Sequence, residues 1–175
     1  MRKIPSREEC LKILESVGAP QNVIKHCIAV SRYARMLAER AARKGNRVNV
    51  RLVEAGGLLH DIGRARTHGV DHGVVGARII RTMGLPEEIA LIVERHVGAG
   101  IPKREAEALG LPARDYLPLT PEEKIVAHAD NLFFGDRKVS MDEVIERFKA
   151  ELGEGSDALK RLRKLQKDVE ALIDP

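Results

Sequence analysis

The sequence predicts an all-α fold, and three observations support this prediction. Hydrophobic residues make up 43% of the 175 residues but aromatic residues only 3%, so the core must consist of Ala, Val, Ile and Leu. Residues typical of helix starts and ends are frequent along the chain, whereas the alternating pattern of strands is almost absent. A chain of this length buries roughly 70% of its unfolded surface. We therefore expect one domain over residues 1–175.

The N-terminal part of the chain is expected to form two helices. Ser6 and Glu9 have the spacing of a capping box that opens the first helix, and Gly18 ends it. Pro20 stands in the first turn of a second helix that runs to about Gly45. Spacings of three and four place the apolar residues of this helix on one face: Val23, Cys27, Val30, Ala34, Leu37 and Ala41.

The middle of the chain is expected to form helices over residues 49–63, 71–84, 86–98 and 102–109. Asn49 and Asp71 are placed as N-caps of the first two, and Pro86 opens the third. The segment Thr120-Pro121-Glu122-Glu123 has the pattern of a capping box with proline at the first helical position. It predicts a helix that extends through Phe133.

The C-terminal residues 140–173 are expected to be a helical appendage to a core of about residues 20–135. Ser140 with Glu143 repeats the capping-box signal, and a last helix begins near Ser156. Apolar residues of this helix form a short heptad seam: Ala158, Leu162, Leu165, Val169 and Leu172. Two interpretations are open. The seam docks on the parent domain, which its length of barely two heptads favours, or it forms a homodimer.

The composition argues against several classes of protein. The longest apolar run, Ile89–Val93, is far shorter than the ~20 residues of a membrane span. Met1-Arg2-Lys3 leads into no apolar signal segment, so we expect a cytoplasmic protein with no membrane partner. Cys10 and Cys27 are too few for a disulfide framework or a thiolate cluster and are expected in the core. Any metal must then be held by histidine and carboxylate side chains.

Positive charge is concentrated in residues 35–51, where six Lys or Arg residues face one Glu. The favoured interpretation is a solvated helix end whose cations complement the helix dipole. Binding of RNA by this stretch stays open as an alternative. The stretch lacks interleaved aromatic residues and a known nucleic-acid motif, so charge alone does not predict a nucleic-acid-binding protein.

Histidine and aspartate residues form a set that is chemically unusual for a core. Four separate helices present an imidazole toward the core side, and two acidic residues accompany them: His26, His60, His72, His96, Asp61 and Asp130. Each one alone is explained as a hydrogen-bonded core residue. If all six were buried in the core without partners, their burial would cost several kcal/mol of folding free energy. A metal ion resolves this cost because it binds neutral imidazoles and ionised carboxylates.

The order of these residues resembles a known family. His26, then His60-Asp61-Ile62-Gly63, then Asp130 is similar to the His…His-Asp…Asp pattern of the HD-domain metal-dependent phosphohydrolases, including the Ile-Gly extension. The resemblance covers about residues 20–135. It implies an HD-domain helical bundle and hydrolysis of a phosphate ester or anhydride by a metal-activated water.

Two further histidines refine the resemblance. His72 and His96 look like the extra positions of six-ligand members, which include HD-type diadenosine tetraphosphate hydrolases and cyclic dinucleotide phosphodiesterases. This implies one divalent ion on His26, His60, Asp61 and Asp130, and a second on His72, His96 and a bridging Asp61. The alternative is one ion, with His72 and His96 left to bind substrate. The ligand mixture suits Fe, Mn, Co or Ni.

Substrate contacts are expected beside this motif. Arg64 stands where many family members have lysine, and we expect it and Asp61 to be catalytic, with Arg64 stabilising phosphate charge. Arg66, His68 and Lys103 are expected to bind substrate. The predicted partner is a small phosphorylated molecule, favoured to be a nucleotide. The alternative function is a non-catalytic HD module that binds a nucleotide or RNA.

Overall fold

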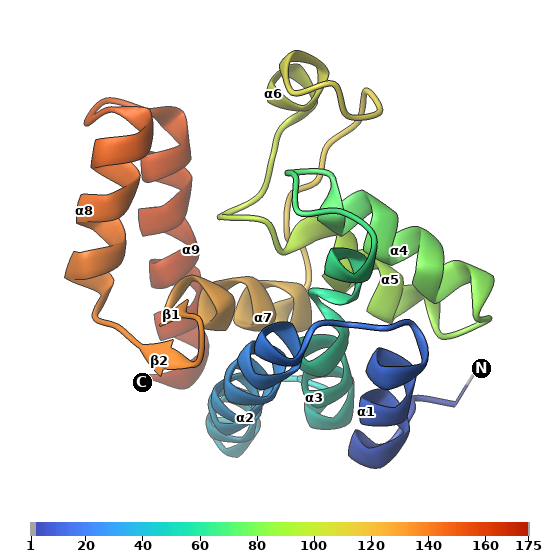
Figure 1. Cartoon of the computed structure of the whole chain (residues 1–175). Coiled ribbons are helices and arrows are strands. Elements are labelled where there is room, and N and C mark those ends of the chain that lie inside the picture. Colours follow the sequence, from blue (N-terminus) through green and yellow to red (C-terminus); the bar gives the residue numbers. More distant parts are fainter. Residues whose placement is uncertain (1–2, 175) are drawn as a thin grey trace.

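The structure, a computed structural model, describes residues 3–174 and confirms the all-α prediction (Figure 1). Its helices are α1 (Arg7–Ser16), α2 (Gln21–Arg43), α3 (Val50–Leu59), the 3₁₀ helix η1 (Ile62–Ala65), α4 (His72–Thr82), α5 (Glu87–Arg95), α6 (Lys103–Ala108), α7 (Pro121–Asn131), α8 (Met141–Leu152) and α9 (Asp157–Ile173). A short antiparallel hairpin, β1 (Phe133–Phe134) and β2 (Arg137–Lys138), joins α7 to α8.

Ser6, Thr120 and Ser140 cap their helices as the sequence predicts, but only two of the three predicted capping boxes are complete. Ser6 and Ser140 each complete a capping box, at α1 and α8. Thr120 caps α7 through the backbone N–H of Glu123, but the carboxylate of Glu123 does not return the bond. It accepts instead from Arg95 at 3.0 Å and from the Leu119 N–H at 2.7 Å. A buried ion pair thus replaces the second half of the predicted box.

Helix α7 lies at the centre of the molecule and packs against α2, α3, α5 and α9 (Figure 1). Helix α2 packs along α3, and Gly57 permits the close approach of the two helices. A Cβ atom at Gly57 would lie 2.8 Å from the Cα of Ser31, which is closer than real Cβ contacts. This pairing sets the spacing between the helices that carry His26 and His60.

The chain turns sharply after α3, and the predicted helix end at Gly63 is wrong. The α-helix ends at Leu59, and the backbone tightens into η1. At Gly63, a Cβ atom would overlap the carbonyl oxygen of His72 and lie 2.8 Å from the amide nitrogen of Gly76. Only glycine therefore lets η1 pass directly against α4. Asp71 precedes α4 but makes no capping bond, because its carboxylate accepts from the hydroxyl of Thr67 at 2.9 Å.

The last two helices lie side by side at one edge of the molecule (Figure 1). Helix α9 packs against α2, α7 and α8, so its apolar seam docks on the parent domain as favoured. The buried residues are Leu159, Leu162, Leu165, Val169 and Ile173. Ala158 and Leu172, expected in the seam, are only half-buried at its edges. A homodimer stays a prediction.

The connection between α7 and α8 differs from the expectation. Helix α7 ends at Asn131, so the prediction of a helix through Phe133 is wrong. Gly135, at a φ of 61°, reverses the chain, and the Val139 N–H donates to the carbonyl of Leu132 at 2.8 Å. Strands of two residues are too short to show alternation in a sequence.

Two exclusions made from composition can be compared with the structure. Cys10 and Cys27 are both fully buried free thiols, as expected, and burial raises the pKa of Cys10 to about 12. Between residues 3 and 174, no helix combines the length and the apolar character needed to cross a membrane. A cytoplasmic location stays a prediction.

The contact at Gly63 gives a test of the fold. We expect Gly63→Ala to lower the free energy of unfolding by about 3 kcal/mol or more, since the added methyl group meets backbone atoms that cannot move aside cheaply. Gly155→Ala is the matched control, because nothing lies within 4 Å of that position. Urea unfolding followed by circular dichroism measures both. Equal stability of the two variants would contradict the contact.

Candidate metal centre

Six side chains from five segments of the chain meet beside one cleft. They are His26 on α2, His60 and Asp61 just after α3, His72 at the start of α4, His96 just after α5, and Asp130 on α7. These are the residues that the sequence predicts as metal ligands, and the fold brings all six together. His60, His72 and His96 are buried, and so is Asp61.

A first group of ligand atoms surrounds Nε2 of His26. This atom lies 3.2 Å from Nε2 of His60 and 2.9 Å from Oδ1 of Asp130. Nε2 of His60 is 3.3 Å from the same Asp130 oxygen. Oδ2 of Asp61 lies 3.7 Å and 3.8 Å from the two imidazole nitrogens. Three of these residues, His26, His60 and Asp130, have the mutual spacing of a group that could hold a metal ion.

A second group lies on the other side of Asp61. Nε2 of His72 and Nε2 of His96 are 3.1 Å apart. Oδ1 of Asp61 lies 3.3 Å from the first and 3.4 Å from the second. The two carboxylate oxygens of Asp61 therefore face two different pairs of imidazoles.

The other ring nitrogen of each histidine is held by the backbone. Nδ1 donates to a carbonyl oxygen in every case: His26 to Gly135 at 2.6 Å, His60 to Gly57 at 2.7 Å, His72 to Gly69 at 2.8 Å and His96 to Val93 at 2.6 Å. With the proton on Nδ1, each Nε2 carries a lone pair. When both rings of a pair are neutral, their Nε2 atoms face each other with no proton between them, and a cation bound among them removes this repulsion. Backbone-oriented imidazoles of this kind are typical of metal ligands.

The electrostatics of the centre favour ionised carboxylates. Burial alone would raise the pKa of Asp61 and of Asp130, but the imidazoles around them, His60 first, hold both pKa values well below the ordinary range. Burial lowers the pKa of His96. At His60 burial acts in the same direction, but the neighbouring Cys27, Asp130 and Asp61 outweigh it and raise the pKa. A metal ion would compete with a proton for this ring.

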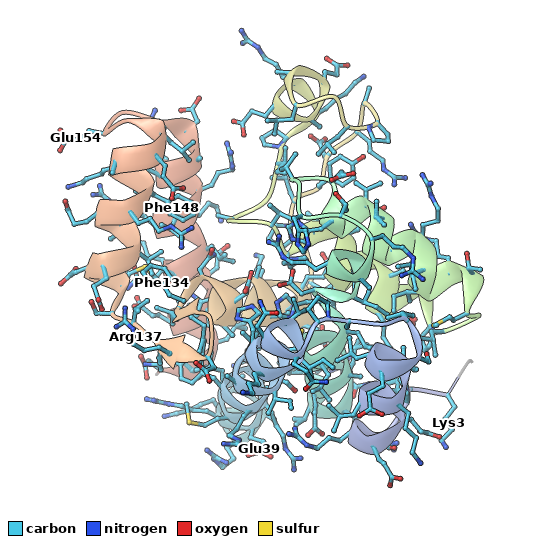
Figure 2. All side chains as sticks on the ribbon, viewed as in Figure 1. Lys3, Glu39, Phe134, Arg137, Phe148 and Glu154 are labelled. Atoms are coloured by element: carbon cyan, nitrogen blue, oxygen red, sulfur yellow. The ribbon has the colours of Figure 1, made fainter. Side chains whose placement is uncertain are left out.

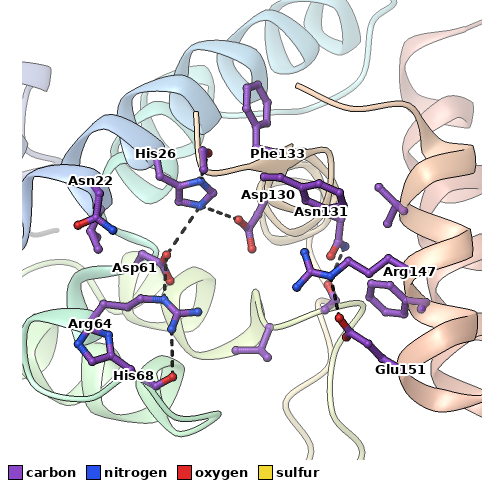
Figure 3. Close-up of a pocket in the computed structure, with 17 residues that line it drawn as sticks. Asn22, His26, Asp61, Arg64, His68, Asp130, Asn131, Phe133, Arg147 and Glu151 are labelled. Carbon is purple, nitrogen blue, oxygen red and sulfur yellow. Dashed lines mark hydrogen bonds and ion pairs between the residues drawn. The ribbon is translucent and has the colours of Figure 1, made fainter. Parts of the chain in front are cut away.

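The centre opens into a cleft of about 560 Å³ (Figure 3). His26, Asp61 and Asp130 line its inner end, and Arg64 and His68 line one wall. Nε of Arg64 donates to Oδ2 of Asp61 at 3.2 Å, and its Nη1 donates to the carbonyl of His68 at 3.2 Å. Two of the predicted substrate-binding residues are thus placed beside the candidate metal ligands.

The other two predicted substrate-binding residues lie elsewhere. Arg66 donates to the carbonyl of Val17 at 2.9 Å, and Lys103 begins α6. Neither is among the described residues that line the cleft. His128, which the sequence argument leaves out of the ligand set, is buried on α7, and burial lowers its pKa to about 4.

The residues of the opposite wall of the cleft are not predicted from the sequence. Phe134 of β1 and Arg147, Phe148 and Glu151 of α8 line it. A signal was present, because all three phenylalanines of this aromatic-poor chain fall within residues 133–148. The hairpin that turns the chain toward α8 is not predicted from the sequence, so the place of α8 beside the candidate metal ligands is not predicted either.

Comparison with known proteins gives a family and several relatives. The model of the family described as HD domain matches residues 23–134. The chain is 54% identical over 166 residues to the uncharacterized protein MJ0778 of Methanocaldococcus jannaschii, which covers 95% of this chain and 98% of that protein.

A second relative is longer than this chain. The tRNA (cytidine(56)-2'-O)-methyltransferase of Thermoplasma volcanium is 44% identical over 170 residues, or 97% of this chain. The chain spans only 48% of that relative's length. Among solved structures, the HD domain of L. monocytogenes phosphodiesterase PgpH in complex with cyclic-di-AMP superposes with a TM-score of 0.53 at 16% identity, over 95% of this chain and 97% of that one. This likeness shows the shared fold.

The convergent lone pairs predict that a divalent metal ion stabilises the protein. After treatment with a chelator, adding Mn²⁺ should raise the free energy of unfolding by about 2.7 kcal/mol at a concentration one hundred times the Kd. Thermal unfolding with and without the metal measures the effect. Asp61→Asn should abolish most of it, since Asp61 faces both pairs of imidazoles. If Mn, Fe, Co and Ni all leave the unfolding curve unchanged, the site does not bind metal.

Proposed function

The chain belongs to the HD domain family, and on this premise we propose that it is a metal-dependent phosphohydrolase. The proposed substrate is a nucleotide-like phosphoester or phosphoanhydride. One observation carries the proposal: four imidazoles donate from Nδ1 to backbone carbonyls, and their Nε2 atoms converge on each other and on the carboxylates of Asp61 and Asp130. This donor set fits divalent transition metals, and Fe, Mn, Co and Ni are the proposed candidates.

The geometry supports two ions. In our proposal one ion would be held by His26, His60, Asp61 and Asp130. A second would be held by His72, His96 and Asp61. The rival arrangement has a single ion in the first group, with His72 and His96 contacting substrate.

The residues of the chain would position the phosphate and balance its charge. When bound, the metal would supply an activated water and offset negative charge on the phosphate. Arg64 presents a guanidinium beside Asp61, so it can clamp a phosphate oxygen and stabilise developing charge. No Ser, Thr or Cys is found among the described residues that line the cleft, which supports water as the nucleophile.

A second candidate function is binding of RNA without catalysis. The name of the Thermoplasma volcanium relative connects this domain with tRNA. Within residues 35–51, Arg35 pairs with Glu54 and Arg40 with Asp174. The other cations of the stretch form no ion pair with the described residues: Arg43, Lys44, Arg47 and Arg51. They leave positive charge available for a phosphate backbone.

A substrate screen distinguishes the two functions. The metal-loaded protein is incubated with phosphomonoesters, cyclic phosphodiesters, dinucleoside polyphosphates and a short RNA, and released phosphate and nucleotides are measured. Asp61→Asn controls for contaminating phosphatases. Turnover that this variant loses supports a hydrolase. Binding of RNA without any turnover supports the second function.

The number of ions can be tested by elemental analysis. The protein purified without chelator should carry between one and two equivalents of a first-row transition metal. Replacing both His72 and His96 by alanine should lower this by about one, because the first group of ligands stays intact. Asp61→Ala should remove most of the metal. Unchanged stoichiometry in the double variant would instead support the one-ion arrangement.

Arg64 gives a test of chemistry that is separate from metal binding. We expect Arg64→Ala to keep its metal and to lose about 2–4 kcal/mol of transition-state stabilisation, the scale of one preorganised charged donor. Arg64→Lys should recover part of the loss, because the lysine ammonium keeps the positive charge but cannot bind a phosphate through two parallel hydrogen bonds as a guanidinium does. The measurement is kcat/KM on the best substrate of the screen, with metal content determined in the same preparation. Full activity of the alanine variant would place the phosphate clamp elsewhere.

A further inference from the structure

We propose that the cleft contains a nucleobase-stacking site on its α8 side, formed by Phe134, Arg147 and Phe148, here called the aromatic wall. The inference rests on the proposed function, because it places the base of a nucleotide at the wall when its phosphate is at the metal centre. Figure 2 labels Phe134 and Phe148 beside α8, and both line the same cleft as His26, Asp61 and Asp130.

The wall presents a flat cation, the guanidinium of Arg147. The guanidinium carbon of Arg147 lies 4.8 Å from the ring centroid of Phe134, so the two groups are stacked in a cation–π contact. Nε of Arg147 donates to Oε1 of Glu151 at 2.8 Å (Figure 3). This i,i+4 pair is exposed, so it offsets the charge of Arg147, while the contact with Phe134 orients the guanidinium. Arg147 is therefore better suited to stack a planar ring than to clamp a phosphate.

Phe148 continues the wall toward the loop after α5. It is half-buried on α8 and approaches the loop after α5, where a Cβ atom at Gly98 would lie 3.8 Å from Cζ of Phe148. Phe133 contrasts with it, because its ring packs on Tyr33 with a centroid distance of 6.0 Å. Phe133 thus has an aromatic partner within the protein, whereas Phe148 forms no ring contact with another described aromatic residue.

The arrangement selects a ligand that is aromatic at one end and anionic at the other. Any nucleobase can stack on an aromatic ring or a guanidinium group, because every base has a flat π-face. The opposite wall offers the Arg64 guanidinium beside the candidate metal ligands, which suits a phosphate. The cleft volume of about 560 Å³ is within the range of small-molecule sites. A nucleotide, free or at the end of a chain, combines these properties.

The test compares ligands that differ only in the base. Isothermal titration calorimetry on the metal-loaded protein measures the Kd of AMP and of ribose 5-phosphate. We expect AMP to bind at least about ten-fold more tightly, the scale of one stacked base. Phe148→Leu and Phe134→Leu should each remove most of this preference and leave the affinity for ribose 5-phosphate unchanged. Arg147→Lys, which keeps the charge but not the flat face, should do the same.

The matched control is Leu152→Ala, because Leu152 is on the same helix, is 52% exposed and is not among the cleft residues. It should change neither affinity. An independent readout is the fluorescence of 2-aminopurine riboside 5'-monophosphate, which stacking quenches. The quenching should be strong with the parent and weak with Phe148→Leu. A 5'-phosphorylated adenosine trinucleotide extends the test to the ends of nucleic-acid chains. The variants of the aromatic wall should lower the affinity for this ligand by the same factor as the affinity for AMP.

Several results would overturn the aromatic wall. These are equal affinities for AMP and ribose 5-phosphate in the parent, equal losses for both ligands in the wall variants, or a trinucleotide affinity that the variants leave intact. Hydrolysis of base-free phosphoesters without any base preference would support the proposed function and contradict the stacking site. A base preference that the wall variants abolish, without turnover of any phosphate, would support the wall and contradict the hydrolase.

Discussion

The carboxylate of Asp61 is the point on which the rest of the centre depends, because its two oxygens face two separate pairs of imidazoles. Its position follows from a constraint on the backbone. Directly after Asp61 the chain tightens into η1, and the missing side chain of Gly63 lets η1 lie against the first turn of α4. Asp61 and His72 are brought together by this contact. A longer α3 would carry the chain past α4 and separate the two ligand groups.

Local bonds orient most of the imidazoles. His60, His72 and His96 each donate from Nδ1 to the carbonyl three residues earlier, so the turn that carries each ring also sets its direction. His26 is different, since the carbonyl that holds it belongs to Gly135, in the hairpin after α7. The hairpin therefore has two functions in the fold: it fixes the ring of His26, and it turns the chain toward α8. Deep burial of this many polar groups costs free energy that a bound cation can offset.

Most of the fold and all six candidate ligands could be predicted from the sequence, for identifiable reasons. Helix starts at Ser6 and Ser140 depend on short-range hydrogen bonds, which a spacing of three residues reveals. The ligand set could be recognised because it combines residue types that are costly to bury with an order that resembles a family. Tertiary contacts account for the failures. The end of α3 is set by the approach of α4 to Gly63. The carboxylate of Glu123 accepts from Arg95 instead of from the N-cap backbone of its own helix. Both contacts are made with another helix, so the local sequence does not reveal them.

The cleft is lined by two parts of the chain, and only tertiary contacts bring these parts together. The matched HD domain ends at residue 134, and it contains every candidate metal ligand. Arg147 and Phe148 lie beyond it on α8, which is held over the cleft by the packing of α9 on α7 and α2. The C-terminal helices, expected from the sequence as an appendage, thus contribute residues that line the same cleft as the candidate metal ligands. If the proposed function holds, the matched domain would supply the metal-ligating residues, and α8 would supply the contacts that distinguish one substrate from another.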